Sequence, residues 1–156
     1  FDQCTWYGMG PEETYCDRCT GAKLGVFAST TQEALSRYLR PQECGNRTGV
    51  RWAKVMRKDG TGLLFETRKP MDFSALPYTP HELENARHSF ELPRAGKTVV
   101  RTALRQMGVG GDNTWGAFTH DPYLIHCQPG ERMEFEVIVS ALSHEEGGGQ
   151  DENHRC

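Results

Sequence analysis

The segment VRWAKVMRKDGTGLLFET, residues 50–67, gives the clearest indication of the fold class. Two runs rich in apolar residues flank the segment KDGTG, whose Asp59-Gly60 pair is typical of a tight turn between antiparallel strands. The two runs are expected to pair as neighbouring strands. The sequence therefore predicts a β-hairpin here.

Alternation recurs in the C-terminal half of the chain. In MEFEVIV, residues 133–139, apolar and acidic residues alternate, which is typical of a half-buried strand. In TVVRTALRQ, residues 98–106, apolar positions alternate with Arg101 and Arg105. The positions expected to face the core are Met133, Phe135, Val137 and Val139 in the first segment and Val100, Thr102 and Leu104 in the second.

One short helix is expected between the strands. In YTPHELENARH, residues 78–88, Thr79 can cap a helix with Pro80 at its first position and Glu82 at its third. The segment TTQEALSRYLRPQ, residues 30–42, has helix propensity, but Pro41 favours an extended crossover at least as well. The sequence predicts an all-β fold: an antiparallel β-sandwich with one short helix near residues 80–87.

Length, charge and hydropathy narrow the class of protein. The 156 residues fit one domain with its own core, and a formal net charge of −3 offers no strong field for nucleic acid or an anionic membrane. The chain has no apolar run near the roughly 20 residues that span a bilayer, and no signal-peptide layout. It lacks an initiator methionine, which suggests a piece of something longer. A β domain over residues 1–142 and a disordered polar tail over residues 143–156 are expected.

The cysteines are expected to be mostly free thiols. A domain of this size does not need disulfides, which favours a reducing, cytoplasmic compartment. The Cys16-x-x-Cys19 spacing suits zinc, but no second pair accompanies it, so zinc, a bridge and inert thiols all remain open, and no metal is assigned to this chain. Asn46-Arg47-Thr48 matches an N-glycosylation sequon, which matters only in a secreted protein. The six cysteines are Cys4, Cys16, Cys19, Cys44, Cys127 and Cys156.

The stretch MGVGGDNTWG, residues 107–116, is the strongest candidate for a binding loop. Four glycines indicate positive φ or close backbone approach, and Trp115 lies among them, directly before the fourth. A tryptophan can pack into the core, or stack on the apolar face of a sugar ring while Asp112 and Asn113 bind hydroxyls. The local chemistry leaves both roles open.

Carboxylates are numerous, and glycoside hydrolysis needs two of them across the scissile bond. Nothing in their spacing says which two could meet, so solvated turns and ion pairs with arginine are the simpler interpretation. The candidates are Glu12, Glu13, Asp17, Glu43, Asp59, Asp112 and Asp121.

Four blocks together resemble the C-terminal small-chain domain of family 2 β-galactosidases, in the same order and over roughly residues 3–140. They are WYGMGPEETYCDRCTGAKLGVF (residues 6–27), YLRPQECGNRTGVRW (38–52), FSALPYTPHELENARH (73–88) and LRQMGVGGDNTWG (104–116).

The resemblance implies a fold. That domain is a mostly antiparallel β-sandwich related to the galactose mutarotase fold, and it sits beside a TIM barrel that carries two catalytic glutamates. This chain would be its second half, with strand edges exposed that the first half covers, a route to oligomers. The partners implied are the barrel and the first half of the domain.

The resemblance also implies a function. The family's G-G-D-x-[ST]-W motif delivers a tryptophan into the barrel's pocket, and Trp115 occupies that place. The implied chemistry is retaining hydrolysis of terminal β-D-galactosides such as lactose, with magnesium and sodium in the barrel and no catalytic residue in this chain.

Some positions depart from the family pattern. Cys16 replaces a proline, Cys44 an asparagine, and Asn113 a common second aspartate, so a local Cys16–Cys44 contact is one expectation. Charged residues in the first two blocks either scaffold the turns or position the domain against the barrel. These structural-loop candidates are Glu12, Asp17, Arg18, Glu43 and Arg47.

Two functions from other classes remain as alternatives. One is a stand-alone carbohydrate-binding module that uses Trp115, and the other is an assembly module without catalysis. The full-length chain would separate them, because a barrel-encoding segment before Phe1 favours the enzyme domain.

Overall fold

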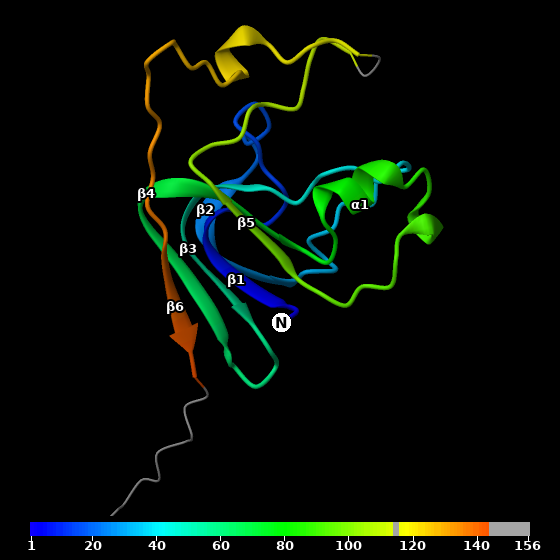
Figure 1. The fold of residues 1–156 in the computed structure, drawn as a ribbon, viewed down its shortest axis with the longest axis vertical. Coiled ribbons are helices and arrows are strands. Elements are labelled where there is room, and N and C mark those ends of the chain that lie inside the picture. The colour runs from blue at the N-terminus through cyan, green and yellow to red at the C-terminus, as the bar shows by residue number, and fades with distance from the viewer. Residues whose placement is uncertain (114–115, 144–156) are drawn as a thin grey trace, which may run out of the picture.

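The computed structural model describes residues 1–113 and 116–143. In this part of the chain, six strands form one antiparallel sheet in the order β2-β1-β3-β4-β5, and β6 pairs with β4 outside that order (Figure 1). The predicted all-β, sandwich-like class is confirmed. The strands are β1 (Gln3–Gly10), β2 (Lys23–Thr30), β3 (Arg47–Met56), β4 (Gly62–Leu76), β5 (Val99–Ala103) and β6 (Ile138–Leu142).

The predicted hairpin is the β3–β4 pair. The Arg57 N–H donates to the Thr61 carbonyl at 2.8 Å, and Gly60 has a φ of 85° that few other residues tolerate. Asp59 accepts a hydrogen bond from the Thr61 N–H at 2.9 Å. The Asp-Gly pair therefore forms the turn that the sequence indicated.

Strand β4 is longer than predicted and strongly bent. Val50 pairs with Met71 and Trp52 with Glu66, so two steps along β3 correspond to five along β4. The extra residues make a bulge around residues 67–70. The rings of Phe65 and Phe73 lie 6.1 Å apart, although eight residues of straight strand would span about 26 Å. The bend lets the first half of β4 pair with β6 and the second half with β5.

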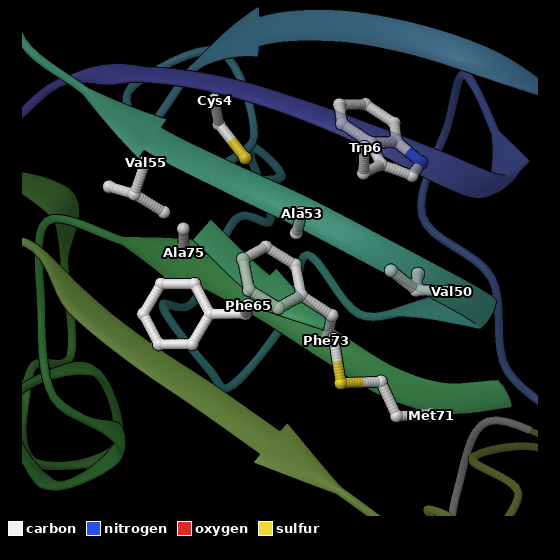
Figure 2. Packing of buried hydrophobic residues seen from close by; sticks show 9 residues of the cluster. All are labelled: Cys4, Trp6, Val50, Ala53, Val55, Phe65, Met71, Phe73 and Ala75. Atoms are coloured by element: carbon white, nitrogen blue, oxygen red, sulfur yellow. The ribbon is translucent and has the colours of Figure 1, made fainter. Parts of the chain in front are cut away.

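The core fills the inner side of this curved sheet (Figure 2). In β1 the inward positions alternate strictly along the strand. A second, smaller cluster of Cys44, Leu76 and Leu83 lies under helix α1 (Pro80–Asn85). The main cluster is formed by Cys4, Trp6, Val50, Ala53, Val55, Phe65, Met71, Phe73 and Ala75.

The β1–β2 hairpin was missing from the sequence prediction. Two of the four inward positions of β1 are Gly8 and Gly10 rather than apolar side chains. The hydrophobic alternation on which strand prediction relies is therefore only half present.

The strand predicted over residues 133–139 is wrong for residues 133–137. β6 begins at Ile138, which pairs with Glu66 directly before the bulge of β4. Beyond Glu66 the bulge interrupts β4, so residues 133–137 have no regular strand edge with which to pair. A cleft of about 730 Å³ lies between residues 67–69 and residues 133–136. Phe135 and Val139, expected in the core, are exposed, whereas Val137 packs against it.

The remaining predicted elements are closer to the structure. The capping box of Thr79 and Glu82 is confirmed, but α1 ends two residues earlier than expected because Ala86 is extended. β5 covers the centre of the strand predicted over residues 98–106. Residues 31–46 form turns and irregular chain, so residues 30–42 form neither the helix nor a regular extended crossover.

Two single-turn 3₁₀ helices, η1 (Ser89–Glu91) and η2 (Asp121–Tyr123), complete the described elements. In the described ranges, no helix has the length and apolar composition needed to cross a bilayer. The predicted disordered tail lies outside the described residues, apart from Ser143.

Candidate functional site

The glycine-rich segment after β5 is closed by its own hydrogen bonds. The Gly108 N–H donates to the Tyr123 carbonyl at 2.8 Å, and the Thr119 hydroxyl donates to the Gly108 carbonyl at 2.9 Å. These contacts join the two ends of residues 108–119, which we call the glycine loop. The loop lies at the opposite end of the molecule from the β3–β4 turn (Figure 1).

Close packing accounts for glycine in this loop more than unusual backbone angles do. A Cβ on Gly111 would lie 2.6 Å from the Ala117 carbonyl oxygen, because the two arms of the loop touch there. In the described part of the loop, only Gly116 has a positive φ, at 117°. The glycines therefore let the backbone fold tightly against itself.

Two of the predicted binding residues, Asp112 and Asn113, lie in the exposed part of the glycine loop. Asp112 and Asn113 are exposed, and Asp112 Oδ1 lies 2.8 Å from Nε2 of His120. Trp115 lies outside the described residues. This part of the loop offers a carboxylate, an amide and an imidazole, which are groups that bind hydroxyls.

Asp17 connects the glycine loop to a distant turn. Its Oδ2 accepts a hydrogen bond from the Gly110 N–H at 2.7 Å. Asp17 is carried by a tight turn in which Tyr15 and Arg18 exchange backbone hydrogen bonds of 3.2 and 2.9 Å. The structure thus brings together two of the sequence blocks described above, residues 6–27 and residues 104–116.

A polar network lies beneath the loop. The buried carboxylate of Asp72 accepts a hydrogen bond from the Gln106 N–H. The Gln106 side chain donates to Glu43 at 3.0 Å, and Arg101 pairs with the same carboxylate. Burial raises the pKa of Asp72, although the Gln106 hydrogen bond acts in the opposite direction. The carboxylate of Glu43 therefore has its partners, Gln106 and Arg101, within this chain.

A cleft of about 600 Å³ lies beside the base of the glycine loop. Residues 40–43 of the crossover form one wall, and Gln106, Met107 and Thr119 belong to the other. The lining mixes polar and apolar groups, as ligand-binding pockets do.

Glu13 organises the loops on this side of the sheet, and the sequence did not single it out for that role. Its carboxylate accepts hydrogen bonds from Arg18 at 2.7 Å, from the Gly45 N–H at 2.8 Å and from the Tyr38 hydroxyl. Burial acts to raise the pKa of Glu13, but these hydrogen bonds and the charge of Arg18 hold it below the usual value. No local spacing signals this role, because Tyr38 and Gly45 lie 25 and 32 residues away.

The other structural-loop candidates separate into buried and exposed groups. Arg47 is buried, lies 4.9 Å from the centre of the Trp6 ring and donates to the Asn46 carbonyl at 3.1 Å. Glu12 is exposed beside the buried Glu13. The structure places Arg47 in the framework and leaves Glu12 at the surface.

The thiols are unbridged where the structure describes them. Cys16 and Cys44 are free, so no disulfide joins them: Cys44 is buried, and Cys16 is exposed near the Tyr123 carbonyl. Burial raises the pKa of both thiols. Within residues 1–113 and 116–143, no three metal-binding side chains gather in one place. Cys4, Cys19 and Cys127 are also free, and Cys156 lies outside the described residues.

The sequon is blocked by burial. The Asn46 side chain is buried and donates to the Thr14 carbonyl at 2.9 Å. A glycan needs an accessible amide, so the burial of Asn46 argues against use of the sequon in the folded chain.

Two further candidate carboxylates lie far from a shared site. Asp59 belongs to the β3–β4 turn, whereas Asp121 starts η2 and pairs with His126 at 3.4 Å. With Asp17 and Glu43 bound inside the framework, the arrangement around the glycine loop suits ligand binding better than acid–base chemistry.

Comparison with known proteins identifies a matching protein family. A family model described as "Beta galactosidase small chain" matches residues 1–139. A β-galactosidase of Halalkalibacterium halodurans is 44% identical over 138 residues, covering 88% of this chain and 14% of that protein. A β-galactosidase of Priestia megaterium is 48% identical over 127 residues, covering 81% and 12%.

A separate subunit also matches. A "Beta-galactosidase small subunit" of Latilactobacillus sakei is 36% identical over 136 residues, covering 80% of this chain and 42% of that protein. The chain thus spans less than half of that subunit and a much smaller share of the two larger relatives.

Proposed function

The chain belongs to the β-galactosidase small-chain family, and from this premise we propose that it is part of a β-galactosidase whose substrate pocket is completed by the glycine loop. The observation that supports this proposal is the geometry of the glycine loop. It is closed at its base by hydrogen bonds to Gly108, and it exposes polar groups at its far end.

The proposed ligand is a terminal, non-reducing β-D-galactoside such as lactose. Trp115 would stack on the apolar face of the sugar or its aglycone, and Asp112 and Asn113 would bind hydroxyls. The reaction would be hydrolysis with retention, as in family 2 glycosidases, with one carboxyl group as acid and base and another as nucleophile. Both belong, in this proposal, to glutamates of a TIM barrel elsewhere in the enzyme, where magnesium and sodium would also bind.

The proposed partner is the remainder of the enzyme, including the first half of this β domain. Apolar side chains on outer strands support this, since Val26 of β2 and Val139 of β6 are 62% and 55% exposed. Such strands also offer a contact between copies of the enzyme. We place the enzyme in the cytoplasm, which the free thiols of five cysteines support.

The test is Trp115→Ala in the full-length β-galactosidase, assayed with a chromogenic galactoside. The expected result is a rise in KM of roughly tenfold, equivalent to about 1.4 kcal/mol of binding free energy, with a lower kcat/KM. Phe118→Ala is the matched control, because Phe118 is a second aromatic in the same loop and its side chain is 93% exposed.

Three outcomes would contradict the proposal. Unchanged kinetics in Trp115→Ala would remove the stacking role. An equal effect of Phe118→Ala would point to a general disturbance of the loop. A loss of several kcal/mol of stability in Trp115→Ala would instead indicate that the tryptophan packs in the core.

A further inference from the structure

Asp17 lies in a space that the glycine loop leaves open for it. A Cβ on Gly108 would lie 2.5 Å from Asp17 Oδ2 and 2.8 Å from the Tyr123 Cβ. A Cβ on Gly110 would lie 3.3 Å from the same oxygen. Neither glycine has a positive φ, so the backbone does not require them, whereas a side chain would clash with Asp17 and Tyr123 at Gly108 and would be tight against Asp17 at Gly110.

The carboxylate is carried by a firmly held turn. Residues 15–18 close on themselves through backbone hydrogen bonds, and Arg18 is bound to the buried Glu13 at 2.7 Å. The hydrogen bond from Gly110 to Asp17 connects residues 93 positions apart in the sequence. Asp17 therefore links the loop to a part of the framework that does not belong to it.

The second carboxylate oxygen of Asp17 argues against the view that this residue serves only to stabilise the fold. Oδ1 is buried and has no hydrogen-bond partner among the described residues. A buried oxygen without a partner costs free energy, which offsets the gain from the bond to Gly110. Removing the side chain is then expected to change the local order of the loop more than the stability of the domain.

We propose that Asp17 is a positioning residue: its carboxylate, seated against Gly108 and Gly110, holds residues 108–110 of the glycine loop in one backbone conformation and thereby sets the affinity for the galactoside. The first half of this statement concerns the loop alone. The second half rests on the proposed function, since Trp115 lies within the loop sequence.

The experiment uses Asp17→Ala in the full-length β-galactosidase, with hydrogen exchange measured on peptides covering residues 106–120. Exchange near Gly110 is expected to quicken roughly tenfold to a hundredfold, the factor for losing one charge-assisted hydrogen bond. KM for a chromogenic galactoside should rise about tenfold while the temperature of unfolding changes little. Asp17→Asn keeps an acceptor oxygen, so it should restore part of the protection and of the affinity.

Asp59→Ala is the matched control. Asp59 also accepts a backbone hydrogen bond, from Thr61 at 2.9 Å, in the turn at the opposite end of the sheet (Figure 1). It should quicken exchange only in that turn and leave residues 106–120 and KM unchanged.

The outcomes separate this inference from the proposed function. Unchanged exchange over residues 106–120 in both Asp17 variants would overturn the positioning role, whatever Trp115→Ala does. Faster exchange with wild-type KM would overturn the link to affinity. If Trp115→Ala also kept wild-type kinetics, the proposed function itself would fail while the contact between Asp17 and the loop stood.

Discussion

Glu12 and Glu13 are adjacent and chemically identical, yet they play different structural parts. Glu12 is exposed, whereas Glu13 is buried and accepts hydrogen bonds from Arg18, Tyr38 and Gly45. The difference comes from groups more than twenty residues away in the case of Tyr38 and Gly45. At the residue scale, the sequence shows which carboxylates exist but does not show which of them acquire partners.

The ionised form of Glu13 is expected to stabilise the fold in a pH-dependent way. Its folded pKa is held below the ordinary value of 4.5. The contribution is therefore fully present above pH 4.5 and is lost as pH falls through the lowered folded pKa. Glu13→Gln should cost about 1.5–3 kcal/mol at neutral pH, as expected for hydrogen bonds to a charged group.

Urea unfolding of the 156-residue chain at a series of pH values checks this. The free energy of unfolding of Glu13→Gln should fall less steeply below pH 4.5 than that of the wild type. Glu12→Gln, one position earlier and exposed, should keep the wild-type slope. Parallel curves for Glu13→Gln and the wild type would remove the proposed contribution of the buried carboxylate.

At the scale of elements, prediction succeeded where a few neighbouring residues decide the structure. The Asp59-Gly60 turn and the capping box of α1 depend on contacts within three or four residues, and both are confirmed. The β1–β2 hairpin was missed because glycines occupy inward positions of β1. Residues 133–137 carry a clear strand pattern without a strand, since the bulge in β4 leaves them no partner edge.

Helix α1 offers a direct test of a local signal. Thr79 Oγ1 accepts from the Glu82 N–H at 3.2 Å, and the Glu82 carboxylate accepts from the Thr79 N–H at 2.7 Å. Thr79→Ala should lower the free energy of unfolding by about 1 kcal/mol, because it leaves a helix N–H without an acceptor. Urea unfolding measures the change, with the exposed Thr20→Ala as control. An equal loss in both variants would contradict a specific capping effect.

At the scale of the whole molecule, the sheet presents apolar side chains that this chain does not cover. Leu24 and Val26 on β2 and Ile138 and Val139 on β6 are each about half exposed or more. The chain spans 14% and 12% of two β-galactosidases and 42% of a small subunit. These observations support the proposed partner, the remainder of a β-galactosidase.

Activity is therefore expected only in the assembled protein. The isolated chain should not hydrolyse a chromogenic galactoside, whereas mixing it with the remainder of the enzyme should generate hydrolysis. The same mixture should slow hydrogen exchange in β2, as burial of Val26 requires. A chain with Asp17→Ala should complement less well at low galactoside concentration. Hydrolysis by the chain alone would contradict the proposal that the catalytic carboxylates lie elsewhere.

The all-β class, the β3–β4 hairpin, the capped helix and the position of the glycine loop could be predicted from the sequence, because each depends on groups close together in the chain. Three features depend on the folded chain as a whole: Glu13 joins two loops, β4 bends to bring Phe65 beside Phe73, and Asp17 contacts Gly110. Those contacts join residues from 8 to 93 positions apart. Their geometry depends on the path of all the chain between them, which no local pattern encodes.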